Sequence, residues 1–340
     1  MRKICIYTTQ FFPTYGGIEF FVHYLSEELI NQNFEITIVT NNLKKHNLRT
    51  KYKVIRTNSI IEKIKIFKKN NFVILINLNF SGLIPIILSR KKFLINHHIN
   101  YEFKSLNKKI NYLNFLKVFL TIFFKNICVS NYVSRKILGK SKIIHNFYND
   151  NFFKKLNFEK KGDFIFCGRL VDQKGVVIII EAIKILKKRF KSITCSIVGD
   201  GPELNKLKKL VKKYSLQKNI QFYGKKNNFT VSKIMNRHRC ALIPSIWEEP
   251  YGIIALESLA CCDHVISSNK GGLPEAINKY GTLTKPTISN FSKHMYLFLK
   301  KKKKLKLNKK MKKEKYLKNH SIKNVVKKYI NFINENQLIT

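Results

Sequence analysis

Acidic residues are scarce in this chain of 340 residues, which has 20 Asp and Glu against 65 Lys and Arg, a formal net charge of +45. Such an excess is typical of proteins that bind nucleic acid or an anionic membrane surface. Most of the basic residues are Lys, however, and they accompany abundant Asn, Ile and Phe, a mixture that an A/T-rich coding sequence also produces. The excess of basic residues therefore has two explanations, a compositional bias of the coding sequence or a functional attraction to anionic lipid or to a phosphorylated substrate.

Paired cysteines and a secretory leader are also missing. The seven Cys form no C-x-x-C pair and no pattern of a disulfide framework, which fits a reducing cytosol. The start, "MRKICIYTTQFFP", has no apolar core and no small-residue cleavage site, so we predict no signal peptide. The most apolar stretch, 72–89, is interrupted by polar residues, Gly and Pro. It predicts a buried strand, a turn and a helix rather than a membrane span.

Two further segments allow a membrane interpretation. "YLNFLKVFLTIFF", at 112–124, is too short to span a bilayer, and we expect a helix that faces the core, with contact to lipid as the alternative. The lysine-rich segment 297–318 is most simply a solvated helical face. Its alternative is a patch that contacts a membrane surface.

Short β-rich apolar runs alternate with longer helical patterns along the chain. This alternation predicts a parallel sheet covered by helices on both faces, and hence an α/β protein. The pattern lapses in the polar stretch 146–162 and then restarts. We therefore expect two doubly wound Rossmann-like domains, at 1–150 and 151–315, and a final helix at 316–340 that can return to the N-terminal domain. The predicted strands lie at 3–9, 34–40, 71–77, 92–96, 125–130, 163–170, 192–203, 220–224, 240–245 and 264–268.

The segment "PSIWEEPYGIIALESLACCD", at 244–263, places Glu249 and Glu257 eight positions apart around an expected helix start at Pro250. Eight residues of helix separate two side chains by roughly 12 Å along the axis. The free N–H groups of Tyr251 to Ile254 would form an anion site, and Gly252 would let a ligand approach the backbone. A sugar, a diphosphate and a ribose match this order of groups. The alternative is that Glu249 only stabilises the helix N-terminus and that Glu257 is a solvated residue of the helix.

A second motif, "FCGRLVDQKG", opens the second domain. Arg169 and Lys174 follow the end of a strand and are flanked by Gly168 and Gly175. Both cations could reach a pyrophosphate in the crevice outside the strand ends. In so basic a chain each residue alone carries little information, and their shared position after a strand makes the pair informative.

Nucleotide-cofactor and metal motifs are absent. Gly16 and Gly17 lie between the first strand and helix without the G-x-G-x-x-G spacing. A second candidate begins at Gly199 and Gly201 but has Leu204 in place of the third Gly. No Asp-x-Asp pair is present to hold a divalent metal on a diphosphate. We expect no metal and no cofactor, so that Arg, Lys and helix amides must stabilise a leaving diphosphate.

Together these segments resemble the retaining glycosyltransferases of family 4, of the group 1 type, which have the GT-B fold. The resemblance covers nearly the whole chain and ends on that family's Glu-seven-Glu signature. The segments that carry it are "FFPTYGGIEFFVHYLSEEL", "CVSNYVSRKI", "IHNFYND", "FCGRLVDQKG", "SIVGDGPE", "FYG" and "IPSIWEEPYGIIALESLACCDHVISSNKGGLPEAI".

The resemblance implies a role for each matching residue in the second domain, which would bind a nucleotide sugar. Glu249 should contact hydroxyls of the donor sugar, and Glu257 the ribose hydroxyls. The backbone of Tyr251, Gly252 and Ile253 should lie beside the donor. Catalysis would also depend on Arg169 and Lys174, which should hold the diphosphate and stabilise it as it leaves.

In the first, acceptor-side domain, the resemblance implies that Gly16 and Gly17 approach the phosphates or the acceptor when a cleft closes. The family also has a His after a strand of this domain, near the reactive side of the sugar. "FLINHHINYE" supplies His97 and His98, and we favour His98 as the catalytic residue. For both His97 and His98 the alternative is a buried histidine whose hydrogen bonds are made within the core.

Two departures from the family pattern stand out. Cys262, Asp263 and His264 replace a small residue, Gly and Pro, and Phe147 replaces Gly. A metal site at Cys262 to His264 is an alternative that we do not adopt, because one contiguous run seldom supplies tetrahedral geometry.

We therefore predict a cytoplasmic glycosyltransferase, with the inner face of the cell membrane as a candidate peripheral location. Its partners would be a nucleotide-sugar donor, a glycan or lipid-linked glycan acceptor in lipopolysaccharide or capsule synthesis, and an anionic membrane surface. The reaction would be retaining and metal-independent. Three rivals are a nucleotide-sugar epimerase of the same fold, a basic nucleic-acid-binding protein, and a dehydrogenase. We expect no nucleic-acid partner, and the dehydrogenase lacks its fingerprint.

Overall fold

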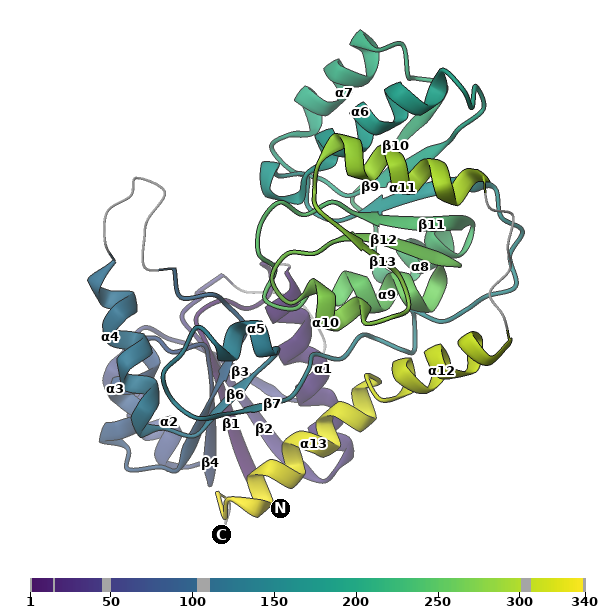
Figure 1. Cartoon of the computed structure of the whole chain (residues 1–340). Helices are drawn as coiled ribbons and strands as arrows, with labels where there is room; N and C mark the ends of the chain where they lie inside the picture. Colours follow the sequence, from purple (N-terminus) through teal and green to yellow (C-terminus); the bar gives the residue numbers. More distant parts are fainter. Residues whose placement is uncertain (1, 15, 45–49, 103–110, 301–306, 339–340) are drawn as a thin grey trace. The chain divides into compact units, whose positions relative to one another are not determined.

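The computed structural model describes residues 2–14, 16–44, 50–102, 111–300 and 307–338. The chain forms two compact units (Figure 1). The first comprises Met1–Phe147 together with Ile322–Thr340, and the second comprises Tyr148–Ser321. Each unit is built around its own parallel sheet, so the expected α/β class is confirmed.

The sheet of the first unit has seven parallel strands in the order β3-β2-β1-β4-β5-β6-β7. Its central strands are buried on both faces, which explains their continuous apolar runs. The strands are β1 Arg2–Thr8, β2 Phe34–Thr40, β3 Lys53–Arg56, β4 Phe72–Ile76, β5 Phe93–His97, β6 Asn126–Cys128 and β7 Ser141–Ile143.

Helices cover both faces of this sheet, with α2, α3 and α4 on one side and α1 and α13 on the other (Figure 1). The last helix, α13, completes the core: Tyr329 is fully buried and accepts a hydrogen bond from Asn96 Nδ2 at 2.9 Å. Phe147, which ends the first segment, stacks on Phe21 at 4.9 Å between ring centroids. The helices are α1 Gly17–Asn31, α2 Ile60–Lys68, α3 Phe80–Leu88, α4 Tyr112–Leu120, the 3-10 turn η1 Thr121–Phe123, α5 Asn131–Ser134 and α13 Ile322–Glu335.

The sheet of the second unit has six parallel strands in the order β10-β9-β8-β11-β12-β13. The strands are β8 Gly162–Cys167, β9 Cys195–Val198, β10 Ile220–Gly224, β11 His238–Ile243, β12 His264–Ser268 and β13 Thr282–Thr284. The helices are η2 Asp172–Lys174, α6 Val176–Lys187, α7 Leu204–Lys213, α8 Asn228–Asn236, α9 Ile253–Cys261, α10 Leu273–Ile277, α11 Ile288–Lys300 and α12 Leu307–Lys318.

The second unit extends to Ser321 rather than to residue 315, because α12 packs on it. Tyr316 Oη donates to the carbonyl oxygens of Glu275 and Ala276 at 2.9 and 3.0 Å. Lys313 Nζ donates to the carbonyl oxygen of Leu259 at 2.9 Å. The lysine-rich segment therefore belongs partly to this unit, and its residues 301–306 lie outside the described residues.

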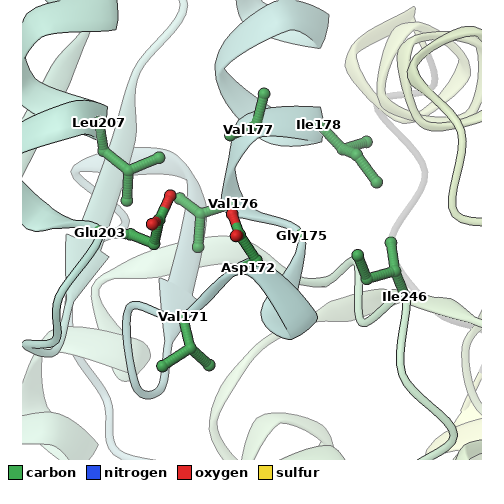
Figure 2. A pocket seen from close by; sticks show the side chains of 9 residues that line it. All are labelled: Val171, Asp172, Gly175, Val176, Val177, Ile178, Glu203, Leu207 and Ile246. Atoms are coloured by element: carbon green, nitrogen blue, oxygen red, sulfur yellow. The ribbon is translucent and has the colours of Figure 1, made fainter. Parts of the chain in front are cut away.

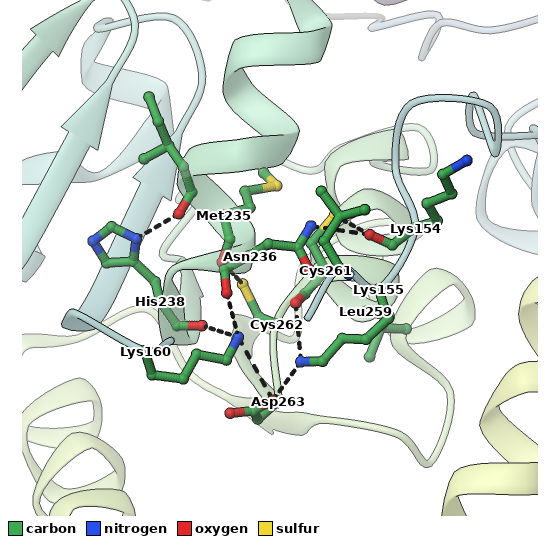
Figure 3. Close-up of polar contacts among 12 residues, drawn as sticks. Lys154, Lys155, Lys160, Met235, Asn236, His238, Leu259, Cys261, Cys262 and Asp263 are labelled. Atoms are coloured by element: carbon green, nitrogen blue, oxygen red, sulfur yellow. Dashed lines mark hydrogen bonds and ion pairs between the residues drawn. The ribbon is translucent and has the colours of Figure 1, made fainter. Parts of the chain in front are cut away.

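The stretch expected to be a linker is instead tied to the second unit. Lys155 Nζ lies 2.5 Å and Lys160 Nζ 3.7 Å from the Asp263 carboxylate (Figure 3). Lys160 also donates to the carbonyl oxygens of Asn236 and His238 at 2.7 and 2.9 Å. Asp263, one of the departures from the family pattern, thus anchors the chain where it enters this unit, and the boundary falls at 147/148 rather than at 150/151.

All ten predicted strands are present, and the three that the sequence did not reveal are β3, β7 and β13. Each has three or four residues and lies at an edge of its sheet. An edge strand needs no continuous apolar run, since one side of it lacks a neighbouring strand. The stretch 72–89 forms β4 and α3 as expected, and within the described residues we find no helix with the length and apolarity to cross a bilayer.

The prediction for 112–124 was wrong in one respect. The segment is helical, as expected, but it does not face the core. Of the residues of α4 only Val118 is buried, while Phe115 and Leu113 are 60% and 61% exposed. The periodicity identified the residues that share a face without showing which way that face points.

We predict that Tyr329→Ala lowers the stability of the first unit by about 3–5 kcal/mol, since it empties a fully buried aromatic site. Exposed Lys327→Ala is the matched control on the same helix and should change stability by no more than about 0.5 kcal/mol. Thermal unfolding measures both. Equal effects in the two variants would contradict the packing of α13 into this core.

Candidate functional site

The second unit has a topological switch point between β8 and β11. These neighbouring strands lead into crossovers that run in opposite directions across the sheet, so the loops that follow them separate. Ligands of open parallel sheets bind in the crevice at such a point, outside the carboxyl ends of the strands. Both predicted motifs lie in these two loops, 168–175 after β8 and 244–252 after β11.

The two loops pack directly on each other. Gly175 has a φ of 67°, and a Cβ added to it would lie 2.2 Å from the carbonyl oxygen of Pro244. Ile246 N–H donates to the carbonyl oxygen of Gln173 at 2.9 Å. Glycine is therefore required at 175 both for its left-handed conformation and for the close approach of backbone.

An ion pair joins the two motifs. Lys174 Nζ contacts Glu249 Oε1, and Ser245 Oγ donates to the same oxygen at 2.7 Å. Glu249 is 6% exposed, and these partners offset the cost of burying its charge. The structure thus brings together the predicted diphosphate-binding cation and the predicted sugar-binding carboxylate. Ser245 was not predicted from the sequence.

A third loop, after β12, closes on the backbone of Glu249. Gly272 N–H donates to the Glu249 carbonyl oxygen at 2.7 Å. Gly271 has a φ of 57°, and an added Cβ would lie 2.2 Å from that oxygen. No role for these two glycines was predicted from the sequence, although a Gly-Gly pair directly before a helix indicates a close approach of backbone.

Helix α9 begins at Ile253, not at Pro250 as expected. Gly252 is the N-cap, with a φ of 86°, and an added Cβ would lie 2.5 Å from Leu273 Cδ2. Gly252 has no side chain with which to cap the first amides of α9. Tyr251 is 1% exposed and precedes the helix. The predicted amide site therefore shifts to Gly252, Ile253 and the residue that follows.

Glu257 lies on α9 as a half-buried carboxyl that accepts no hydrogen bond from the described residues. Burial raises the pKa of Glu257 to about 8. Its charge also acts on Cys167 at the end of β8, whose pKa is raised well above its usual value by burial first and then by Cys262 and Glu257. Glu257 is thus near the end of the central strand.

Arg169 is exposed and forms no ion pair within the described part of the chain. It follows Gly168, whose N–H donates to the carbonyl oxygen of Val198 at 3.0 Å. A Cβ added at Gly199 would lie 1.8 Å from the Gly168 carbonyl oxygen. The loops after β8 and β9 therefore approach closely, but the structure does not bring Arg169 into the pair formed by Lys174 and Glu249.

In the first unit, the two candidate histidines differ in their hydrogen bonds. His97 has both ring nitrogens engaged, with Tyr101 Oη at 2.8 Å and Asn126 Oδ1 at 2.9 Å. His98 packs on Phe21, and its buried Nε2 has no hydrogen-bond partner among the described residues. Burial, followed by the charge of His97, lowers the pKa of His98 to about 3, so its imidazole is neutral at physiological pH.

Gly16 and Gly17 lie at the start of α1, where Gly16 is the N-cap in extended conformation and Gly17 is the first helical residue. A Cβ added at Gly16 would lie 2.7 Å from Glu19 Oε2. This buried carboxylate in the first turn was not singled out from the sequence. The predicted approach of a phosphate or an acceptor to these glycines stays a prediction.

Comparison with known proteins supports the family assignment. Residues 148–318, half of the chain, match the model of the group 1 glycosyl transferases. The chain belongs to the group 1 glycosyltransferases. It is 27% identical over 320 residues to an uncharacterized glycosyltransferase of Methanocaldococcus jannaschii, covering 81% of this chain and 77% of the relative. A second glycosyltransferase of that organism is 32% identical over 170 residues, 48% of this chain and 45% of the relative.

Solved structures confirm the fold of this glycosyltransferase. The protein HepE of Anabaena, solved in complex with UDP, superposes with a TM-score of 0.80 at 15% identity, over 98% of this chain and 100% of HepE. The expected GT-B fold, with two Rossmann-like units, is thereby shown.

A cavity of about 370 Å³ in the glycosyltransferase lies beside the loop that carries Lys174 (Figure 2). Apolar side chains and the carboxylates of Asp172 and Glu203 line it, and both carboxylates pair with Lys206, at 3.2 and 2.7 Å. Such a lining does not suit a diphosphate. A second cavity, of about 460 Å³, adjoins the Glu249 loop and includes Lys270 in its lining.

The side chains of Cys262, Asp263 and His264 do not point to a common metal-binding position. Cys262 is buried, Asp263 pairs with lysines, and His264 Nε2 is 2.9 Å from Thr282 Oγ1. Across the described residues no three His, Cys, Asp or Glu side chains are grouped so that they could hold a metal ion.

We predict that the stability of the glycosyltransferase falls as the pH rises from 6 to 9. The Glu257 carboxyl holds its proton in the folded state up to about pH 8, whereas the unfolded chain releases it near its usual value of 4.5. The folded state therefore binds more protons in this window, and stability declines through it. In Glu257→Gln the decline in melting temperature should be smaller. An identical pH dependence in wild type and variant would contradict the buried, protonated carboxyl.

Proposed function

We propose that this glycosyltransferase moves a sugar from a nucleoside-diphosphate donor, held by the second unit, to a glycan acceptor, with retention of anomeric configuration and without a metal ion. The observation that carries the proposal is the ion pair between Lys174 and Glu249 at the switch point of the sheet. It lies next to the start of α9, whose N-cap, Gly252, has no side chain to cap the first amides.

Each donor group would meet a matching protein group. The carboxylate of Glu249 would accept hydrogen bonds from sugar hydroxyls, while Lys174 and Arg169 would bind the diphosphate as a point charge and a planar fork. The amides at the start of α9 add the positive end of a helix dipole. Glu257, which lacks a hydrogen-bond donor among the described residues, would accept from ribose hydroxyls. The UDP complex of HepE supports a nucleoside-diphosphate donor for the shared fold.

The transfer step would depend on charge stabilisation by these groups. An acceptor hydroxyl oxygen bonds to the anomeric carbon as the bond from that carbon to the diphosphate breaks. The acceptor proton passes to an oxygen of the departing diphosphate on the same face of the sugar, which gives retention. Lys174, Arg169 and the α9 amides would stabilise the negative charge that develops on the diphosphate, in the role usually filled by a metal ion.

For the acceptor, we propose a lipid-linked surface glycan, such as a lipopolysaccharide or capsule intermediate, at the cytoplasmic face of the cell membrane. The resemblance to family 4 and the formal charge of +45 support this proposal, since the positive charge favours anionic acceptors and surfaces.

The donor is tested by thermal shift with UDP, GDP, ADP, NAD and a short oligonucleotide. A ligand at 100 times its Kd adds about 2.7 kcal/mol, which shifts the melting temperature by roughly 4–7 °C. We expect one nucleoside diphosphate to give this shift with and without EDTA. Glu257→Gln should reduce it, while the exposed control Glu159→Gln should not. A shift by NAD or the oligonucleotide alone would refute the donor assignment.

The reaction course is tested by NMR of the anomeric proton during hydrolysis or transfer of the identified donor. We expect the first-formed product to keep the donor configuration. Glu249→Gln should lower kcat/KM by about 100-fold or more, as loss of a preorganised polar contact does. Because Glu249 would contact the sugar, its variant should retain the shift by the nucleoside diphosphate itself. An inverted product, or epimerisation without transfer, would contradict the proposal.

A further inference from the structure

Helix α4 and the turn η1 present large apolar side chains to solvent. Phe115 and Phe123 are 60% and 65% exposed, and the others are between 43% and 76% exposed. We refer to these residues as the α4 apolar face: Tyr112, Leu113, Phe115, Leu116, Phe119, Ile122 and Phe123. Most fall at spacings of three or four, so they form one stripe along the helix.

The inward side of this helix carries a single buried apolar residue, Val118, between the polar residues Asn114 and Thr121. Asn114 Nδ2 donates to the carbonyl oxygen of Glu102 at 2.8 Å. Thr121 Oγ1 donates to the Val118 carbonyl oxygen at 2.5 Å and accepts from Gly139 N–H at 2.9 Å. The bonds of Asn114 and Thr121 to Glu102 and Gly139, together with buried Val118, hold the helix on the unit. Its orientation is therefore the reverse of that of a helix that contributes its apolar residues to a core, and the exposed face is a built feature of the fold.

Further exposed apolar residues lie on α2 and α3, which pack on each other and cover the same side of the sheet as α4 (Figure 1). They are Ile60 and Ile61 on α2, and Ile84, Ile87 and Leu88 on α3. Singly exposed apolar residues are ordinary, but this number on one side of one unit marks an interaction surface.

The charge around this surface identifies the kind of partner. From residue 60 to residue 149 the sequence holds 16 Lys and Arg and only two acidic residues, Glu62 and Glu102. A second copy of the chain would bring the same positive charge and be repelled. A bilayer with anionic headgroups offers an apolar interior for the stripe and negative charge for the surrounding cations.

We propose that the α4 apolar face inserts into the headgroup region of an anionic bilayer and attaches the first unit to it. This deepens the peripheral location proposed above by naming the residues that make the contact. Vesicle binding is measured without any donor, so its failure would leave the transfer reaction untouched.

The test is sedimentation with vesicles of phosphatidylcholine, with and without phosphatidylglycerol, at low salt and at about 1 M NaCl, where the Debye length is only about 3 Å. Attraction by charge alone is lost at high salt, whereas inserted apolar side chains keep the protein bound. We expect wild type to bind anionic vesicles and to retain measurable binding at high salt. Phe115→Ser, Leu116→Ser and Phe123→Ser together should lower the partition coefficient at high salt by about 100-fold or more.

The matched control is Ile185→Ser, Phe229→Ser and Ile288→Ser, three apolar residues of the second unit with 48%, 54% and 39% exposure. This variant should bind vesicles as wild type does, and both triple variants should keep the wild-type melting temperature. Phe115→Trp should show quenching by bromine-labelled lipid tails.

Three results would overturn the proposal. One is complete loss of wild-type binding at high salt, and another is an equal loss in both triple variants. The third is a dimer that dissociates on substitution of the α4 apolar face, without vesicle binding, which would assign the face to a second copy.

Discussion

The buried ion pair between Lys174 and Glu249 is the constraint on which the arrangement of the second unit's loops depends. A carboxylate that is 6% exposed is stable only if its oxygens have partners, and these must come from other segments. Lys174 arrives from the loop after β8, and Ser245 from the loop that also carries Glu249. To bring these loops close enough, backbone must touch backbone, which explains the glycines at 175 and 271. One electrostatic requirement thus accounts for several side chains that lie far apart in the sequence.

The buried parts of the fold could be predicted from the sequence, because a strand covered on both faces is a continuous apolar run. The strands β1, β4, β8 and β11 are of this kind. The edge strands β3, β7 and β13 are short and partly exposed, so they leave no such pattern. Helix α4 shows a second limit. A stripe of apolar residues indicates that they share a face, but its direction depends on which side forms the hydrogen bonds, and here Asn114 and Thr121 do so.

The parts of the candidate site that lie within short sequence motifs could be predicted, whereas the contacts between distant loops could not. The spacing of Glu249 and Glu257, and the position of Lys174 after a strand, are visible in the sequence. The start of α9 was not, because the left-handed conformation of Gly252 depends on contact with Leu273 from another loop. The two histidines illustrate the same point. Tyr101 and Asn126 engage both nitrogens of His97, and no local pattern reveals that its neighbour has an unpartnered Nε2.

The placement of α13 has a consequence for the order of folding during synthesis. The first unit is discontinuous: its core includes Val325, Val326 and Tyr329, which are translated after the whole of the second unit. All residues of the second unit are therefore translated before the helix that packs on α1 in the first unit. Domains usually fold in the order in which they emerge. In this chain the N-terminal unit must wait, with apolar surface uncovered, until the segment that follows the second unit has been made.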